Sequence, residues 1–191
     1  WSVAAQDRSA PTVREFLGLN THTIQFKPER YEGVIYRLRD YHPIHWDLQD
    51  DTSVLPDWPM SKNKVNWLRV YGSWVEAGYQ PNVCLMFSHL PPEKWNDLSN
   101  DSAKYAASFV NHFGPGGRWP YGTSVGIGNE PGHFSDEDYM TAFDAMSQAI
   151  RRANPKMLIT TCNVKLKPSG KYWKDLELFR DRLDQFDVIT T

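Results

Sequence analysis

Short apolar runs alternate with longer amphipathic stretches along the 191 residues of this chain. The short runs predict buried strands, because a strand covered on both faces needs no polar alternation. The longer stretches repeat apolar residues at helical spacing and predict helices, and residues 1–14 predict a polar lead-in. We expect strands at 16–19, 43–48, 82–87, 124–129 and 157–162, a sixth strand beginning at 187–191, and helices at 28–40, 61–78, 101–113, 135–153 and 172–186.

The predicted helices are defined by apolar stripes and by residues that can cap them. Ser61, Asp101 and Ser135 can each accept a hydrogen bond from a first-turn amide, and Gly78 can end the second helix. The stripes are Tyr31, Val34, Ile35 and Leu38 in the first helix; Val65, Leu68, Gly72 and Val75 in the second; Tyr105, Ala106, Phe109, Val110 and Phe113 in the third; Tyr139, Phe143, Met146, Ile150 and Ala153 in the fourth; and Tyr172, Leu176, Phe179, Leu183 and Phe186 in the fifth.

Five successive strand-then-helix units predict an α/β fold with a parallel sheet covered by helices. The alternatives are a doubly wound open sheet and a (β/α)8, or TIM, barrel. Residues 16–23 hold a single glycine, so no phosphate-binding loop follows the first strand. Polar residues at the carboxyl ends of several strands favour the barrel. A barrel takes about 250 residues, so we expect residues 1–191 to form one incomplete barrel domain, the first five and a half units, continuing beyond Thr191.

The strand predicted at 124–129 leads into Asn129-Glu130-Pro131. A carboxylate directly after a parallel strand lies at the carboxyl edge of the sheet, where α/β folds place their chemistry. If Glu130 points inward, strand parity also turns Gly128 and Gly126 inward, and the alternate residues, Val125 and Ile127, point toward the helices. Inward glycines leave room beside the acid, so the motif predicts a functional carboxylate.

This motif, within alternating strands and helices, resembles the fourth strand of the large clan of retaining glycoside hydrolases with (β/α)8 barrels. The resemblance implies that Glu130 is the general acid/base and that Asn129 binds the sugar hydroxyl next to the anomeric carbon. It places the nucleophile after a seventh strand and suggests a secreted or periplasmic protein. The segment 82–95 loosely resembles the xylosidase- and iduronidase-type members. Many members carry an Arg near the end of strand two, where this sequence places His45-Trp46-Asp47.

Several other polar or aromatic residues fall near predicted strand ends and are candidate sugar contacts: His89, His45, Trp46, Asp47, Asn20 and Asn163. Each of them can instead satisfy nearby backbone groups, and parity lets only one of His45 and Trp46 face inward. Asp47 does not match the family's nucleophile position, so we expect a substrate contact or a structural hydrogen bond. His133 could line the pocket or enter the next helix.

Composition narrows the classes of partner. A net charge of −2 offers no basic field for nucleic acid, and no apolar run is long enough to span a bilayer. Aromatic residues make up 14% of the chain and could stack on sugars or fill the core. We expect Cys84 and Cys162 to be buried free thiols, since their strands are not neighbours.

The sequence predicts neither a cofactor nor a metal site, because the six histidines show no HExxH spacing. No Gly-x-Ser-x-Gly elbow points to a serine hydrolase. We therefore expect a retaining glycoside hydrolase that acts on a poly- or oligosaccharide. The alternatives are a sugar-binding barrel without activity and a polysaccharide-active enzyme of other chemistry, such as a lyase. A glutamate on strand seven would separate these.

Overall fold

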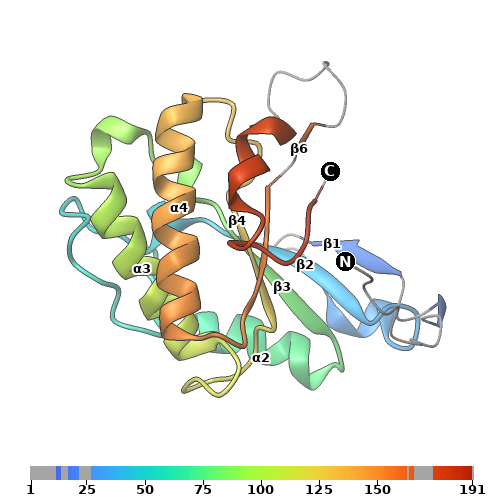
Figure 1. The fold of residues 1–191 in the computed structure, drawn as a ribbon. Coiled ribbons are helices and arrows are strands. Elements are labelled where there is room, and N and C mark those ends of the chain that lie inside the picture. Colours follow the sequence, from blue (N-terminus) through green and yellow to red (C-terminus); the bar gives the residue numbers. More distant parts are fainter. Residues whose placement is uncertain (1–11, 14–16, 22–26, 163, 166–173, 191) are drawn as a thin grey trace.

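A computed structural model describes residues 12–13, 17–21, 27–162, 164–165 and 174–190. Five parallel strands form one sheet in chain order (Figure 1), and a parallel bridge from Thr160 to Val188 begins a sixth. The strands are β1 (Gly18–Asn20), β2 (Arg37–His42), β3 (Gln80–Leu85), β4 (Ser124–Ile127) and β5 (Leu158–Thr160). This order confirms the predicted arc of a barrel, because a doubly wound sheet reverses its strand order at a switch point.

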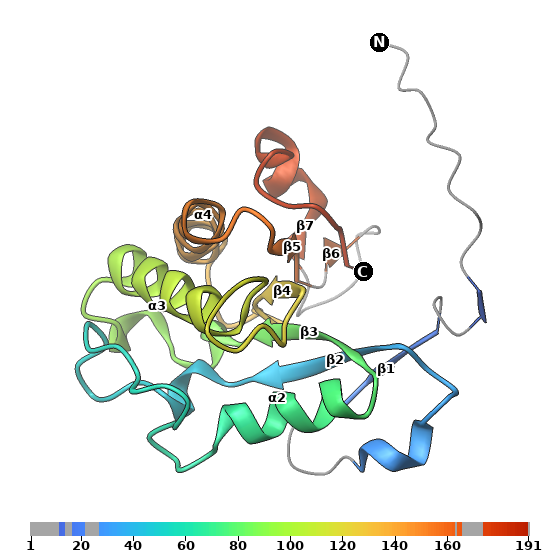
Figure 2. The same cartoon turned by 90° about the horizontal axis from the view of Figure 1, so that it is seen from below.

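Helices return the chain from β2 to β3, from β3 to β4 and from β4 to β5. Figure 2 shows α3 and α4 side by side, with α2 beside β2 and β3. The helices are α2 (Trp67–Glu76), α3 (Leu98–Phe113) and α4 (Asp136–Ala153), and the 3-10 turns are η1 (Pro28–Tyr31), η2 (Ile44–Trp46), η3 (Phe87–His89), η4 (Pro92–Lys94) and η5 (Leu176–Arg182). A second, two-stranded sheet pairs β6 (Val164–Lys165) with β7 (Lys174–Asp175).

The two faces of the large sheet differ in chemistry. The helix-covered face is apolar and buried at Leu38, Val83, Leu85, Val125, Ile127 and Ile159. The inner face carries two rows of register partners, Asn20–Arg39–Asn82–Ser124 and Tyr41–Cys84–Gly126–Thr160. The predicted parity of Gly126, Val125 and Ile127 is therefore confirmed. The polar side chains of the sheet thus lie mainly on its inner face, which suits a site at the carboxyl ends of the strands.

Two predicted elements near the start of the chain are wrong. Residues 28–40 do not form one helix: they form the short turn η1 and then strand β2. Residues 43–48 are not a strand, because η2 occupies their centre. The error comes from β2 itself, which is polar on both faces. Arg39 and Tyr41 face the inside, while Asp40 and His42 are buried on the helix side.

The helix stripes are confirmed where the helices are long. The predicted stripe of α3 is fully buried, as is that of α4 except for the partly buried Ala153. Ser135 caps α4 as predicted: its Oγ accepts from the Asp138 amide at 3.0 Å and donates to Asp138 Oδ2 at 2.7 Å. Two caps are wrong: Asn66 caps α2 in place of Ser61, and Asp97 caps α3 in place of Asp101.

The buried face of α2 is also not the predicted one. Aromatic residues fill it, namely Trp67, Tyr71 and Trp74 beside Gly72, whereas Val75 is exposed. Near the carboxyl end, the predicted helix 172–186 is wrong, because the 3-10 turn η5 starts only at Leu176; Tyr172 lies outside the described residues. Phe179 and Phe186 of its stripe are buried.

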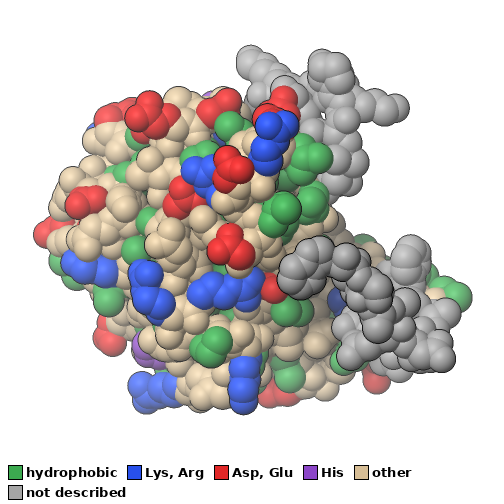
Figure 3. Space-filling view, in the orientation of Figure 1, with side chains coloured by type: hydrophobic (Ala, Val, Ile, Leu, Met, Phe, Trp, Pro, Cys, Tyr) green, Lys and Arg blue, Asp and Glu red, His purple; other side chains and the backbone are tan. Residues whose placement is uncertain are grey.

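The surface and the thiols complete the fold. Cys84 and Cys162 are both free and buried, as predicted. Figure 3 shows acidic and basic side chains interspersed on the face that carries α3 and α4. Within the described residues, no helix has the length and apolar character needed to cross a membrane.

Candidate functional site

The turn after β4 holds Glu130 in an unusual backbone conformation. The strand ends at Ile127, and Gly128 leaves it with φ +88°. Glu130 has φ +45°, a left-handed conformation that costs a residue with a side chain about 1–3 kcal/mol. Backbone strain of this kind collects at functional sites, so the outlier itself points to Glu130.

The predicted strand 124–129 is thus two residues too long, and the predicted inward position of Gly128 is wrong. A Cβ on Gly128 would lie 3.2 Å from the ring of Phe87 and 3.4 Å from that of Tyr139, on the helix side. Hydrogen bonds fix the turn; among them, the Gly128 amide donates to Leu85 O at 2.9 Å, and Ser88 Oγ donates to Asn129 O at 3.2 Å. The site therefore rests on a turn and not on strand parity.

Glu130 lies at the junction of two cavities. The central cavity, about 440 Å³, is lined by Tyr41, Pro43, His45, Trp46, Met86, His89, Asn129 and Glu130. The rim cavity, about 430 Å³, is lined by Ser88, His89, Pro91, Asn129, Glu130 and His133. Glu130 is the only carboxylate among the described residues that line either cavity. An exposed acid between two hollows can meet a group that bridges them.

Arg39 anchors Asn129, and sequence reasoning missed it. Its Nη2 donates to Asn129 Oδ1 at 3.1 Å and to Cys84 Sγ at 3.1 Å, and its guanidinium lies 4.9 Å from the centre of the Tyr41 ring. Burial raises the pKa of the Cys84 thiol to about 11, so the protonated thiol donates to Gly128 O at 3.1 Å. An arginine near the end of strand two is therefore present after all.

Two candidate histidines stack at the edge of the central cavity. The rings of His45 and His89 lie 5.7 Å apart at 25°. Burial lowers the pKa of both rings; the second cause is the charge of His89 for His45, and of His133 for His89. Both imidazoles are therefore held neutral and can accept as well as donate hydrogen bonds near neutral pH.

The other candidates are distributed unevenly. Trp46 lines the central cavity, with its ring stacked near that of Trp67. His133 lines the rim cavity. Asn20 lines neither cavity; its Nδ2 donates to Tyr41 Oη at 2.7 Å. Asn163 lies outside the described residues.

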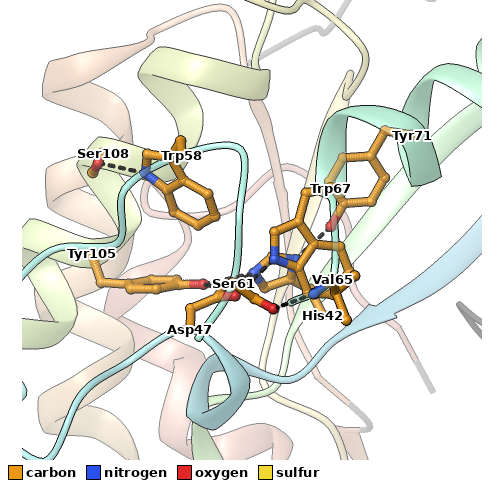
Figure 4. Close-up of polar contacts among 9 residues, drawn as sticks. All are labelled: His42, Asp47, Trp58, Ser61, Val65, Trp67, Tyr71, Tyr105 and Ser108. Atoms are coloured by element: carbon orange, nitrogen blue, oxygen red, sulfur yellow. Dashed lines mark hydrogen bonds and ion pairs between the residues drawn. The ribbon is translucent and has the colours of Figure 1, made fainter. Parts of the chain in front are cut away.

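Asp47 lies apart from the cavities, in a buried network shown in Figure 4. Its carboxylate is 2.6 Å from His42 Nε2, accepts a bond from Trp67 Nε1 at 2.7 Å, and accepts another from Tyr105 Oη. Tyr71 Oη contacts the other ring nitrogen of His42 at 2.5 Å. Of the two roles predicted for Asp47, the geometry matches the structural hydrogen bond.

In the described part of the chain, no group of three or more His, Cys, Asp or Glu side chains is arranged to hold a metal ion. The chemistry available at the edge is therefore that of one carboxylate, three imidazoles, a carboxamide and aromatic faces. Such groups can move a proton and hold hydroxyl-rich ligands.

The sequence and the structure were compared with known proteins. No family model and no curated protein matches the sequence. Solved structures do match: a family 39 glycoside hydrolase from the gut symbiont Bacteroides cellulosilyticus WH2 (14% identity, 76% of this chain and 31% of that chain, TM-score 0.54), a glucosidase from Croceicoccus marinus (16%, 85% and 38%, 0.60) and an exo-beta-1,4-mannosidase from Opitutaceae bacterium strain TAV5 (15%, 83% and 34%, 0.56).

These likenesses concern the fold. The chain spans about a third of the length of these three proteins, and its sheet corresponds to part of their TIM barrels. The predicted fold class is confirmed by this match together with the parallel strand order.

Proposed function

We propose that this chain is part of a retaining glycoside hydrolase that cleaves an O-glycosidic bond of a poly- or oligosaccharide. The observation that carries the proposal is the placement of Glu130. A strained turn at the carboxyl end of β4 holds this acid between two cavities. The TIM-barrel fold shared with glycoside hydrolases supports the proposal, as does the resemblance of the Asn129-Glu130-Pro131 motif.

Glu130 would act as the general acid/base. In a retaining mechanism, one carboxyl group protonates the leaving oxygen and later activates water, while a second carboxylate attacks the anomeric carbon. A position at the junction of the cavities suits the first role, because the two sugars joined by the bond would lie on either side of the acid. The second carboxylate would come from outside the residues described, because Glu130 is the only carboxylate among them that lines the rim or the central cavity.

Asn129 would bind the sugar through its amide group. Arg39 occupies Asn129 Oδ1, so the carboxamide cannot rotate freely and its Nδ2 is left to donate. A sugar hydroxyl next to the anomeric carbon is an acceptor that such a donor can hold. Neutral His45 and His89, with the face of Trp46, would contact the remainder of the ring. On the resemblance alone, we further propose a secreted or periplasmic protein.

The test is Glu130→Gln in the full-length protein. Activity on natural glycosides should fall by about 10²–10⁴-fold, the usual contribution of general acid–base catalysis. An aryl glycoside with a good leaving group should lose less in the first step, and azide should restore turnover by replacing the water that Glu130 activates. The azide product should keep the anomeric configuration of the substrate.

Glu76→Gln, on the exposed end of α2, is the matched control and should leave activity unchanged. Near-normal activity of Glu130→Gln on natural substrate would refute the assignment. If the wild-type protein binds glycans but cleaves none, the inactive sugar-binding barrel becomes the better description.

A further inference from the structure

A third cavity, which we call the lysine cavity, adjoins the central one. It has a volume of about 270 Å³ and is lined by His45, Leu48, Gln49, Asp50, Thr52, Lys62, Leu90 and Lys94. His45 lines both this cavity and the central cavity. The rim, central and lysine cavities therefore follow one another along the carboxyl edge of the sheet, with Glu130 and His45 at the two junctions.

The lysine cavity carries local positive charge in a chain of net charge −2. Lys62 and Lys94 reach it from separate segments, and Asp50 is the only acidic residue among the described residues that line it. Lys62 Nζ lies 3.3 Å from Asp50 Oδ1, with both side chains exposed. The ammonium of Lys94 has no partner in the described part of the chain. One positive charge is thus left without an acid.

Hydrogen bonds hold the walls of the lysine cavity in place. Thr52, which is buried, donates to Asp101 Oδ2 at 2.6 Å and accepts from the Asn96 amide at 2.9 Å. On the other side, the Asn63 amide donates to Trp46 O at 3.2 Å, so the segment of Lys62 is tied to the turn that carries His45. Because the walls are already in place, the main ordering cost of binding an anion is that of the two exposed lysine side chains.

We propose that the lysine cavity binds an anionic group, a carboxylate or a sulfate ester, carried by a sugar of the glycan outside the bond that is cleaved. The inference rests on the proposed function, since the ligand is the same glycan that reaches Glu130 through the central cavity. Lys94 supplies the free cation. Lys62 offsets Asp50, so removing Lys62 leaves an acid that repels the ligand. The preferred substrate is therefore an acidic glycan.

Binding by the full-length Glu130→Gln variant tests the proposal, because that variant does not consume the ligand. The probes are three tetrasaccharides: neutral xylotetraose, an oligomer of uronic acid, and a sulfated galactose oligomer. We expect at least one acidic probe to bind about tenfold more tightly than the neutral one. This preference should shrink in 1 M NaCl, where the screening length falls to roughly 3 Å. The two acidic probes distinguish carboxylate from sulfate.

Three further substitutions should change the affinity for the acidic probe in opposite directions. Lys94→Ala should weaken binding of the preferred acidic probe by about threefold, and Lys62→Ala by more, whereas Asp50→Asn should strengthen it. Binding of xylotetraose should not change. Lys104→Ala, an exposed lysine of α3, is the matched control and should not alter either affinity.

The outcomes separate the two proposals. Equal affinity for neutral and acidic probes, or a preference that Lys94→Ala and Asp50→Asn leave unchanged, would overturn the anionic subsite and leave Glu130's role intact. Failure of every tetrasaccharide to bind would overturn both. Tighter binding of an acidic probe, weakened by Lys94→Ala and strengthened by Asp50→Asn, would establish the subsite.

Discussion

Two histidines three residues apart, His42 and His45, lie in opposite environments. His42 ends β2 on the helix side, is fully buried, and has partners at both ring nitrogens. His45 follows in η2 and is half-buried at the cavity edge, and its buried Nδ1 has no hydrogen-bond partner in the part of the chain that the structure describes. Three residues of chain thus separate a buried, fully hydrogen-bonded network from the edge of a cavity.

The difference teaches how this fold divides stability from chemistry. A buried polar network stabilises only if each member is satisfied, and the His42 network meets that condition. Its effect is to hold the segment after β2 in place, which in turn presents His45 and Trp46 to the central cavity. At the edge, His45 Nδ1 has no partner among the described residues and Glu130 is left-handed; both features are typical of functional sites.

The largest effect on folding is expected for Asp47→Ala. This change removes the acceptor of three buried donors, His42 Nε2, Trp67 Nε1 and Tyr105 Oη. Removing one partner of a buried ionic pair costs about 3–5 kcal/mol, so the free energy of unfolding should fall by about that amount. Denaturant unfolding of the full-length protein measures it.

The control is Asp57→Ala, an exposed acid of the same loop, which should leave the unfolding midpoint unchanged. A small loss of stability for Asp47→Ala, together with a loss of substrate binding in the folded variant, would reverse the comparison. Asp47 would then belong to the sugar site.

A smaller effect is expected for Gly128→Ala, compared with Gly78→Ala. Both glycines have similar positive φ, +88° and +83°, so both changes should cost about 1–2 kcal/mol for the left-handed conformation. A methyl group at Gly78 meets nothing within 4 Å, whereas one at Gly128 lies 3.2 Å from Phe87. Gly128→Ala should therefore be the more destabilising of the two.

Measuring activity distinguishes the two glycine variants further, because the Gly128 turn carries Glu130 and the Gly78 turn follows α2. The full-length Gly128→Ala variant should lose turnover, while Gly78→Ala should keep it. Equal losses of turnover would mean that the turn does not position the acid.

The same contrast explains what could be predicted from the sequence. The stripes of α3 and α4 were predictable, because one face of each meets the apolar core. The motif at Glu130 was predictable because β4 is apolar up to Ile127. Strand β2 was not, since Arg39 and Tyr41 face the interior and Asp40 and His42 are satisfied by partners distant in sequence. The alternation of Arg37, Leu38 and Arg39 was the only local signal of a strand.

The smallest effect concerns the pKa of His45 and His89. Burial lowers both from 6.5, and each ring is further lowered by a neighbouring histidine. A lowered folded-state pKa means that the unfolded chain binds the proton more readily. The two rings thus contribute stability that is full above pH 6.5 and is lost as the pH falls through their folded pKa.

His89→Ala should therefore raise the pKa of His45, because it removes both the neighbouring charge and part of the burial. NMR titration of the imidazole Cε1–H signals measures the pKa directly. His112→Ala, at the end of α3, should leave the pKa of His45 unchanged. Two results would contradict this prediction: a pKa of His45 at or above 6.5 in the wild-type protein, or a pKa that His89→Ala does not change. Either would mean that the two imidazoles are separately solvated and do not form a coupled, partly buried pair.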